Sequence, residues 1–372
     1  MDFMEEVRRT DREALARRLA ACDTARVERA LAREEPDEED ILSLLSPAAD
    51  PFLEAIARRS AELTKRRFGR VIQLYVPLYL SNECVNQCLY CGFAHRVETP
   101  RVTLSPAEAV AEARLLHEEG FRHILLVSGE DPRRVDLPYL LDVVNELRPL
   151  FHSISIEIQP LARGEYARLV AAGVDGLALY QEVYDPRLYR RYHPAGPKRS
   201  MKRRLAAIAA GGEAGMRSLG IGVLLGLAPW RAEAFLLLLH GRALARTFWR
   251  SRISVSFPRI NDAAGGFKAP FPVEDRSLVH MLCTARIVLP DAELVVSTRE
   301  RAALRDNLIG LGVTRMSAGS RTSPGGYSHP GCHEGEQFRI TDNRPPAEIA
   351  RAIAARRREP VWKDFDRHFI AP

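Results

Sequence analysis

The feature that most constrains the fold is a regular alternation of short apolar, β-rich segments with helix-capable segments from about residue 71 onward. We expect eight of these segments to be strands: 71–80, 123–128, 153–158, 175–180, 219–226, 253–257, 293–297 and 313–317. Strands separated by helices form parallel βαβ units, and eight of them favour closure into an α/β barrel of the TIM (β/α)8 type. An open, doubly wound sheet is the alternative that the pattern alone leaves open.

Helix boundary signals support this division. Ser105, Pro106 and Glu108 match a capping box, and Gly120 is placed to end the helix that the box begins. Asp50 followed by Pro51 is typical of a helix N-cap with proline at the first helical position. Both patterns indicate helices outside the eight expected strands.

The two ends of the chain depart from the alternation. The first 68 residues carry charged, helix-forming stretches, and the chain turns polar and glycine-rich after about residue 318, before a short helix at 345–358. We therefore expect an N-terminal helical extension over 1–68 and a barrel over 69–320. A C-terminal loop and helix segment over 321–372 is expected to pack on the barrel.

Composition argues against two classes of partner. The net charge is +6, but only five of the 54 basic residues are lysines, and most arginines stand beside acids along the chain. Proteins that bind nucleic acid more often gather basic residues on one face, with interleaved aromatics. No apolar run reaches the roughly 18 residues of a membrane span, and the charged N-terminus differs from a signal peptide. We expect a cytoplasmic protein with neither nucleic acid nor membrane as a partner.

The most specific signal is a cysteine loop after the first expected strand. Cys84, Cys88 and Cys91 form a C-x3-C-x2-C pattern with a tyrosine before the last cysteine. Thiolates are soft ligands that suit iron–sulfur clusters and zinc. Three of them bind three irons of a four-iron cluster and leave the fourth iron open; structural zinc would need a fourth ligand, which His95 could supply. The remaining cysteines are isolated and are interpreted as structural thiols: Cys22, Cys283 and Cys332.

Polar side chains also follow the expected carboxyl ends of nearly all the strands. In α/β barrels the loops at this end assemble the active site, so the accumulation predicts a functional rim. The residues concerned are Ser128, Gly129, Glu130, Glu157, Gln159, Gln181, Glu182, Arg259, Thr298, Arg299 and Ser317.

The cysteine loop resembles the signature of the radical S-adenosylmethionine (SAM) superfamily. Further segments are similar to the aromatic amino acid lyase branch of that superfamily, and most of all to the tyrosine lyases of thiamine biosynthesis. These segments include LVSGEDP, SIEIQPL, YQEVYDPRLY, STRERAALRDN, MSAGSRTSPGGY and EPVWKDFD, and they extend from about residue 70 to the C-terminus.

The resemblance implies both the cofactors and the reaction. It implies a [4Fe–4S] cluster on the three cysteines and SAM at the open iron, reductively cleaved to methionine and a 5′-deoxyadenosyl radical. The radical takes a hydrogen from the amino group of L-tyrosine, and the Cα–Cβ bond cleaves to 2-iminoacetate (dehydroglycine) and p-cresol. 2-Iminoacetate is a precursor of the thiamine thiazole ring. The implied partners are therefore tyrosine, an electron donor such as flavodoxin or ferredoxin, and a complex with a thiazole synthase.

Three alternatives stay open at this point. A tryptophan lyase of the same branch shares these motifs. The tyrosine lyase of hydrogenase maturation shares them too, but carries a C-terminal extension with a second cysteine cluster, whereas Cys283 and Cys332 belong to no C-x2-C pair. The non-enzymatic alternative is a zinc-stabilised binding protein on a barrel scaffold.

Site roles on the cofactor side follow partly from the resemblance. Ser128, Gly129 and Glu130 stand where the superfamily has a Gly-Gly-Glu motif that meets the methionine ammonium, with serine in place of the first glycine. A carboxylate paired with an ammonium in a dry pocket is physically reasonable. Of Gln181 and Glu182, we expect one to face the site, Gln181 as a catalytic residue or Glu182 as a cofactor ligand.

Site roles on the substrate side rest mainly on chemistry. Glu157 is expected to bind the ribose or the substrate amine, and a structural ion pair is the alternative. Arg299 follows the seventh strand, and its planar fork can clamp the tyrosine carboxylate with two hydrogen bonds. Ser317 and Arg321 are expected to complete the amino acid pocket.

Overall fold

The computed structural model describes residues 2–263, 265–329, 331 and 334–363, and its centre is a closed barrel of parallel strands. The strands are β1 (Val71–Ser81), β2 (His123–Ser128), β3 (Ser153–Glu157), β4 (Gly176–Ala178), β5 (Ser218–Gly222), β6 (Arg252–Ser256), β7 (Glu293–Val296) and β8 (Arg315–Ser317). Strand β1 pairs with both β2 and β8, which closes the sheet. The (β/α)8 prediction is confirmed, and the open-sheet alternative is wrong.

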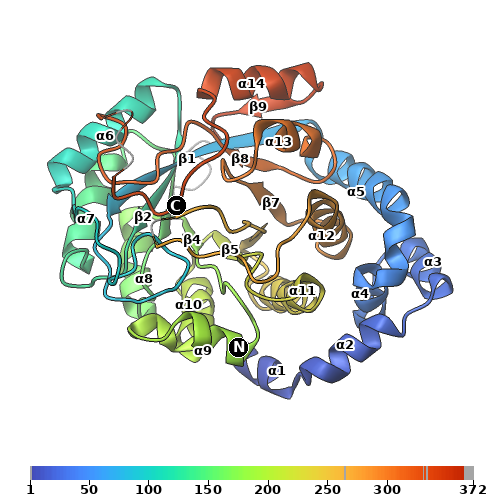
Figure 1. Cartoon of the computed structure of the whole chain (residues 1–372). Coiled ribbons are helices and arrows are strands. Elements are labelled where there is room, and N and C mark those ends of the chain that lie inside the picture. Colours follow the sequence, from blue (N-terminus) through green and yellow to red (C-terminus); the bar gives the residue numbers. More distant parts are fainter. Residues whose placement is uncertain (1, 264, 330, 332–333, 364–372) are drawn as a thin grey trace.

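Helices surround the barrel, as Figure 1 shows in a view along its axis. Those that follow the strands are α6 (Pro106–Glu118), α7 (Leu137–Leu147), α8 (Arg163–Ala172), α9 (Pro186–Tyr192), η2 (Pro197–Arg199), α10 (Met201–Glu213), α11 (Trp230–Thr247), α12 (Asp275–Val288) and α13 (Ala302–Leu308). After β8 come α14 (Pro346–Ala355) and a ninth strand, β9 (Glu359–Val361), which pairs in parallel with the start of β1.

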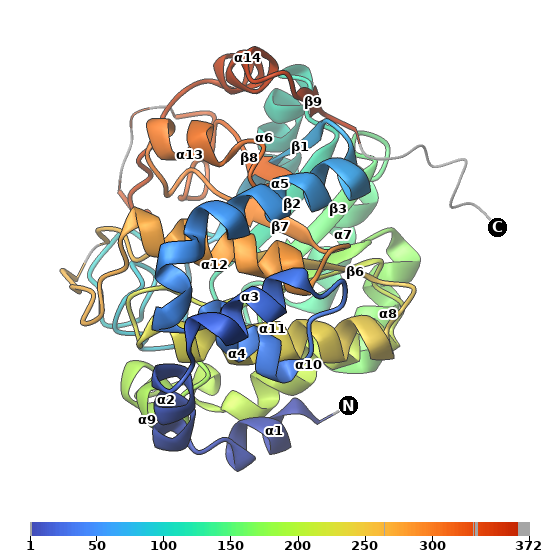
Figure 2. The same ribbon diagram turned by 90° about the vertical axis from the view of Figure 1, so that its right-hand side faces the viewer.

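The N-terminal residues form an arc of helices outside the barrel. Its members are α1 (Phe3–Arg9), α2 (Arg12–Ala20), α3 (Thr24–Ala32), α4 (Glu38–Leu45), η1 (Pro47–Phe52) and α5 (Leu53–Phe68). In Figures 1 and 2 this arc lies along the outer side of α11 and α12, and α5 packs on α12. The division at residues 68 and 320 stays a prediction.

One helix boundary was predicted correctly and another was not. Ser105 and Glu108 form the expected capping box at the start of α6. Asp50, however, lies inside the 3-10 turn η1, and α5 begins only at Leu53. Both carboxylate oxygens of Asp50 accept hydrogen bonds at 2.8 Å from Arg231. The side chain is therefore used in a long-range ion pair instead of a helix cap.

The main hydrophobic core lies between the strands and the surrounding helices, and a small second cluster lies inside the barrel. The second cluster contains Tyr75, Tyr79, Phe93, Leu125, Val127 and Val295. It joins the cysteine loop to the barrel mouth, because Cys84 and Cys91 pack against it.

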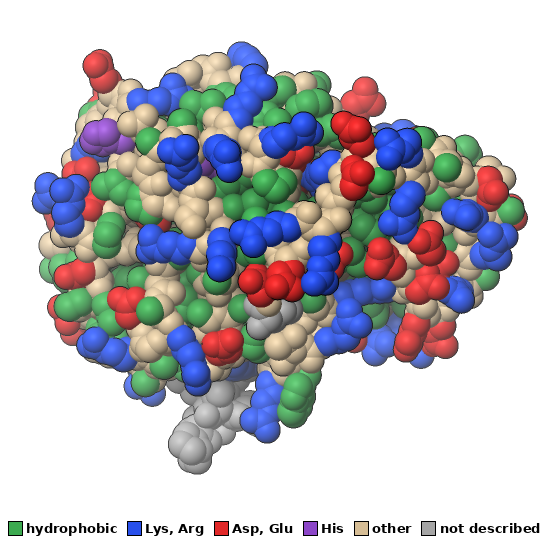
Figure 3. All heavy atoms as spheres, turned by 90° about the horizontal axis from the view of Figure 1, so that it is seen from below, with side chains coloured by type: hydrophobic (Ala, Val, Ile, Leu, Met, Phe, Trp, Pro, Cys, Tyr) green, Lys and Arg blue, Asp and Glu red, His purple; other side chains and the backbone are tan. Residues whose placement is uncertain are grey.

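The surface carries both signs of charge, and Figure 3 shows basic and acidic side chains interspersed over the face seen from below. In the described part of the chain, none of the helices has the combination of length and apolar character that crossing a bilayer requires.

Candidate active site

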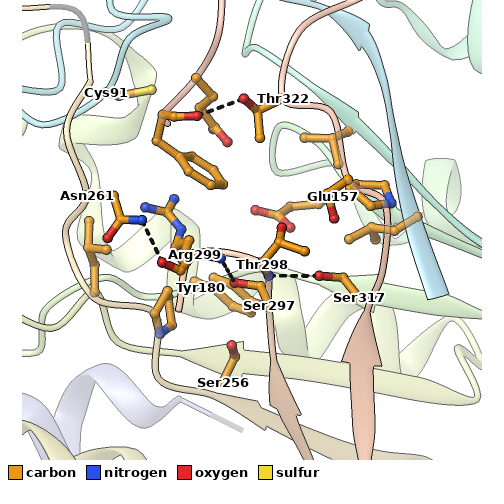
Figure 4. Close-up of a pocket in the computed structure, with 18 of the residues that line it drawn as sticks. Cys91, Glu157, Tyr180, Ser256, Asn261, Ser297, Thr298, Arg299, Ser317 and Thr322 are labelled. Carbon is orange, nitrogen blue, oxygen red and sulfur yellow. Dashed lines mark hydrogen bonds between the residues drawn. The ribbon is translucent and has the colours of Figure 1, made fainter. Parts of the chain in front are cut away.

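A cavity of about 110 Å³ opens at the carboxyl ends of the strands, where the polar rim was predicted. Five predicted or rim residues line it: Glu157, Glu182, Thr298, Arg299 and Ser317. Cys91 lines it as well, so the cavity reaches the cysteine loop. Figure 4 shows Arg299 and Glu157 on opposite sides with their charged groups directed inward, and Cys91 at one edge.

Asn86, between the first two cysteines, anchors the cysteine loop. Its side chain is almost fully buried, donates to the Glu130 carboxylate, and contacts the Cys84 sulfur at 3.8 Å. Its side-chain oxygen accepts from the Lys198 backbone N–H at 2.8 Å. The loop is thus bound on one side to the end of β2 and on the other to the segment after α9, so its shape is fixed by contacts distant in sequence.

The residues of the loop fit the cluster that the sequence predicted. Cys84, Cys88 and Cys91 are free thiols. Burial raises the pKa of Cys88 to about 12 and that of Cys91 to about 11, and the thiols lie close enough to raise one another's pKa. Without a metal these thiols are therefore protonated, and a metal that binds them would displace the protons; three sulfur donors on one loop are the soft ligand set that suits an iron–sulfur cluster.

Gly129 supports the same loop. A Cβ atom at this position would stand 2.1 Å from the Glu83 carbonyl oxygen and 3.2 Å from the Cys84 Cβ atom. Only glycine lets the end of β2 approach the loop this closely.

The zinc alternative would need four donors around a single ion. Within the residues that the structure describes, no three His, Cys, Asp or Glu side chains are grouped as ligands of one metal ion.

Glu182 holds a buried charge network on the cavity wall. Its carboxylate lies 2.7 Å from the Lys198 ammonium and 3.6 Å from the Arg204 guanidinium. Burial acts to raise its pKa, but these two cations outweigh burial and lower it, so the group is ionised. The backbone of Glu182 has φ = 70°, a left-handed conformation that non-glycine residues adopt at a cost and that recurs at functional sites.

The pKa of Glu157, at the end of β3, is shifted in the opposite direction from that of Glu182. Burial raises its pKa from 4.5 to about 7, and the neighbouring Glu182 charge adds to the effect. Among the described residues, no ion pair at 4 Å or less involves its carboxylate. The cavity therefore contains a carboxyl group that can be neutral or charged near physiological pH.

Arg299 is the cation that faces the cavity without a carboxylate partner in the described part of the chain. Burial lowers its pKa, although it stays charged at any pH that the protein tolerates. The guanidinium carbon lies 3.2 Å from the centre of the Phe338 ring, and one nitrogen donates to the Arg259 carbonyl at 3.4 Å. Arg259 itself is paired with Glu300 and Asp275.

Several predicted site residues lie outside the cavity lining. Glu130 accepts a hydrogen bond from Asn86, and the buried Ser128 hydroxyl has no hydrogen-bond partner among the described residues. Gln181 donates to the carbonyl of Val183 within its own loop. The roles assigned to Ser128, Gly129, Glu130 and Gln181 stay predictions.

The two residues expected to complete the amino acid pocket are separated. Ser317 lines the cavity, and its hydroxyl accepts from the Thr298 backbone N–H at 3.1 Å. Arg321 does not line the cavity; its charge acts on Glu119 and Tyr327 at the side of α6. Its neighbours Ser320 and Thr322 both line the cavity, so the chain runs along the cavity here while the Arg321 side chain points away from it. Cys332 lies outside the described residues.

Sequence reasoning missed several cavity residues. Lys198 follows α9, and Gln337 and Phe338 come from the irregular segment after β8. Tyr79, inside β1, donates from its hydroxyl to Gln337 at 2.9 Å. Tyr90 was visible as the aromatic residue before Cys91, but no periodic pattern marks the others.

Comparison with known proteins is consistent with this geometry. Residues 78–239 match the model of the Radical SAM superfamily, and residues 256–357 match the Biotin and Thiamin Synthesis associated domain. The 2-iminoacetate synthase of Escherichia coli is 41% identical, with 98% of this chain and 97% of that protein covered. The chain belongs to the 2-iminoacetate synthase family of radical SAM enzymes. The Salmonella typhimurium 2-iminoacetate synthase is 38% identical over the same shares of both chains.

Among solved structures, the [FeFe]-hydrogenase maturase HydG from Carboxydothermus hydrogenoformans superimposes with a TM-score of 0.83 at 32% identity. The match covers 97% of this chain and 82% of the HydG chain. Radical SAM enzymes use a [4Fe–4S] cluster and SAM, so membership of this family confirms the two predicted cofactors and that the chain is a lyase.

Proposed function

We propose that this chain is a 2-iminoacetate synthase, a tyrosine lyase that cleaves the Cα–Cβ bond of L-tyrosine to 2-iminoacetate and p-cresol. The observation that carries the proposal is Arg299, a buried guanidinium that faces the cavity beside Cys91 and lacks a carboxylate partner in the described part of the chain. A buried cation of this kind is costly unless a ligand pairs with it, and the carboxylate of an amino acid provides that pair.

The proposed roles divide the cavity into two parts. Cys84, Cys88 and Cys91 would hold the cluster, which together with SAM supplies a carbon-centred radical for hydrogen abstraction. Arg299 binds the tyrosine carboxylate, so the amino group is oriented toward the cysteine loop. Glu157 can accept a hydrogen bond from the amine when ionised, or donate one to a ribose hydroxyl when neutral.

The remaining cavity residues would exclude water and offer polar contacts to SAM. Lys198 and Arg204 keep Glu182 ionised, which leaves a negative group for hydroxyls or an ammonium of SAM. Tyr79 and Phe338 cover the cavity with aromatic surface, which protects a radical from solvent.

The partners follow from the balance of the reaction. One electron is needed to cleave SAM and another to convert the hydroxybenzyl fragment to p-cresol, so an electron donor such as flavodoxin or ferredoxin is required. 2-Iminoacetate hydrolyses readily, so transfer within a complex with a thiazole synthase would protect it. Both partners, and a cytoplasmic location, are part of the proposal.

The other lyases of the branch are less well supported. The match to HydG covers 82% of that chain at 32% identity, against 97% of the E. coli 2-iminoacetate synthase at 41%. The deciding experiment incubates reconstituted enzyme anaerobically with reductant, SAM and either tyrosine or tryptophan. We expect p-cresol and glyoxylate, the hydrolysis product of 2-iminoacetate, from tyrosine. Formation of 3-methylindole-type products from tryptophan, with none from tyrosine, would favour the tryptophan lyase.

A further inference from the structure

A short segment after β8, residues 336–341, crosses the cavity mouth and joins its two sides. The Gln337 backbone N–H donates to the Thr322 carbonyl at 2.9 Å, and the Thr322 hydroxyl donates to the Phe338 carbonyl at 2.7 Å. At its far end, the Thr341 backbone N–H donates to the Thr298 carbonyl at 2.9 Å, next to Arg299. We refer to residues 336–341 as the strap.

The strap contacts the cysteine loop directly. The Gly92 backbone N–H, one residue after the last cysteine, donates to the Gln337 carbonyl at 2.9 Å. A Cβ atom at Gly92 would stand 2.4 Å from the Glu336 carbonyl oxygen and 2.8 Å from that of Gln337. Loop and strap are therefore in backbone-to-backbone contact, which leaves little freedom between them.

The next residue of the strap contacts Arg299. The Phe338 ring covers one face of the guanidinium, whose carbon lies 3.2 Å from the ring centre. Asn261 adds a second connection, because its side-chain amide donates to the carbonyls of Arg299 at 2.8 Å and Arg339 at 3.1 Å. A guanidinium stacked on a ring has its N–H groups directed outward in its own plane, parallel to the ring, where they remain available for a carboxylate.

We propose that Phe338 is a positioning residue for the lyase reaction. Its ring fixes the plane of the Arg299 guanidinium, and its neighbour Gln337 fixes the cysteine loop to the same short backbone segment. The distance between the amino group of a bound tyrosine and the radical source is then set by two adjacent residues. Phe338 need not touch the reacting atoms to do this. The inference rests on the proposed function, since it concerns the same carboxylate clamp.

The test compares Phe338→Leu, which keeps an apolar side chain but loses the ring face, with Phe338→Tyr, which keeps the face. All variants are assayed as cluster-loaded enzyme. Cation–π contacts correspond to about a 2-fold to 30-fold effect on affinity. We expect Phe338→Leu to weaken tyrosine binding within that range and to raise the ratio of 5′-deoxyadenosine to p-cresol at least fivefold. Iron content and SAM affinity should stay at wild-type values, and Phe338→Tyr should restore both tyrosine affinity and coupling.

Binding of tyramine, which lacks the carboxylate, distinguishes loss of the carboxylate clamp from a general disturbance of the cavity. Phe338→Leu should weaken tyrosine binding but leave tyramine binding within about twofold of wild type, because the ring acts through the clamp. Phe271→Leu is the matched control, since this aromatic side chain is 37% exposed and lies outside the cavity lining. It should behave as wild type. If the leucine variant does not fold, Phe338→Met, with similar volume and no ring face, answers the same question.

Two results would overturn the inference. One is wild-type coupling and tyrosine affinity in the folded leucine or methionine variant, and the other is an equal loss of tyrosine and tyramine binding. Failure of the proposed function looks different, because the wild-type enzyme itself would then produce no p-cresol from tyrosine.

Discussion

Replacement of Glu157 by glutamine should stabilise the folded protein more at high pH than at low pH, because the cavity raises the pKa of the Glu157 carboxyl. Burial raises the pKa of this carboxyl from 4.5 to about 7 in the folded protein, with Glu182 adding to the effect and Arg204, Arg299 and Lys198 opposing it. The tyrosines that face it (Tyr75, Tyr79 and Tyr180) are themselves neutral, because burial raises their pKa.

The sign follows from proton binding. The folded state holds the Glu157 proton more tightly than the unfolded chain does, so this group stabilises the fold less as the pH rises from about 4.5 to about 7. Above that range the carboxylate is charged in both states, and the penalty is complete. A pKa rise of this size corresponds to about 3 kcal/mol at pH 8 and about 1 kcal/mol at pH 5.5.

Glu157→Gln removes the charge and keeps the shape. In the cluster-free protein, we expect the free energy of unfolding of the variant to exceed that of wild type by up to about 3 kcal/mol at pH 8. At pH 5.5 this difference should be about 2 kcal/mol smaller. Anaerobic urea denaturation at the two pH values measures this difference. Glu182→Gln is the control of opposite sign, because Lys198 and Arg204 lower the pKa of Glu182 below its ordinary value. An equal effect of Glu157→Gln at both pH values, or destabilisation at pH 8, would show instead that the Glu157 carboxylate is paired in the folded protein.

Four further predictions address the two sides of the site. Cys88→Ala should abolish binding of about four irons per chain, whereas Cys283→Ala, at a thiol buried away from the loop, should retain iron in elemental analysis. Arg299→Lys should bind tyrosine moderately less well but release 5′-deoxyadenosine without matching p-cresol, because lysine lacks the two-pronged fork; unchanged coupling in product analysis would remove Arg299 from the site. Glu130→Gln should weaken SAM binding about tenfold or more in equilibrium dialysis, and unchanged affinity would make Glu130 only a support for Asn86. Gly129→Ala should lower the iron content after reconstitution, because its methyl group would collide with the Glu83 carbonyl; full iron loading would contradict this.

The parts of the fold that follow local rules could be predicted from the sequence. The alternation of strands and helices and the capping box at Ser105 depend on short-range periodicity and hydrogen bonding, and both match the structure. Asp50 could not be placed, because its role depends on Arg231, far along the chain. Strand β9 was missed because it is three residues long and contains a proline, so only its pairing with β1 defines it.

The same distinction applies to the candidate site. Glu157 is the last residue of β3 and Arg299 comes three residues after the end of β7, so barrel geometry alone brings them to the cavity. Phe338 reaches it from an irregular segment whose path depends on individual hydrogen bonds, which no sequence period encodes. Arg321 shows the converse, because its neighbours Ser320 and Thr322 line the cavity whereas its own side chain lies near Glu119 and Tyr327, and nearness to a strand end does not predict which way a loop side chain points.

Product stoichiometry measures the cleavage of tyrosine at the barrel mouth without relying on any variant. Cluster-loaded enzyme with one-electron reductant, SAM and uniformly ¹³C-labelled tyrosine is quenched at intervals, and the products are quantified by mass spectrometry. We expect labelled p-cresol and labelled glyoxylate in equal amounts, each matching the 5′-deoxyadenosine formed. 5′-Deoxyadenosine that accumulates without either labelled product, in enzyme with a full iron content, would contradict this expectation.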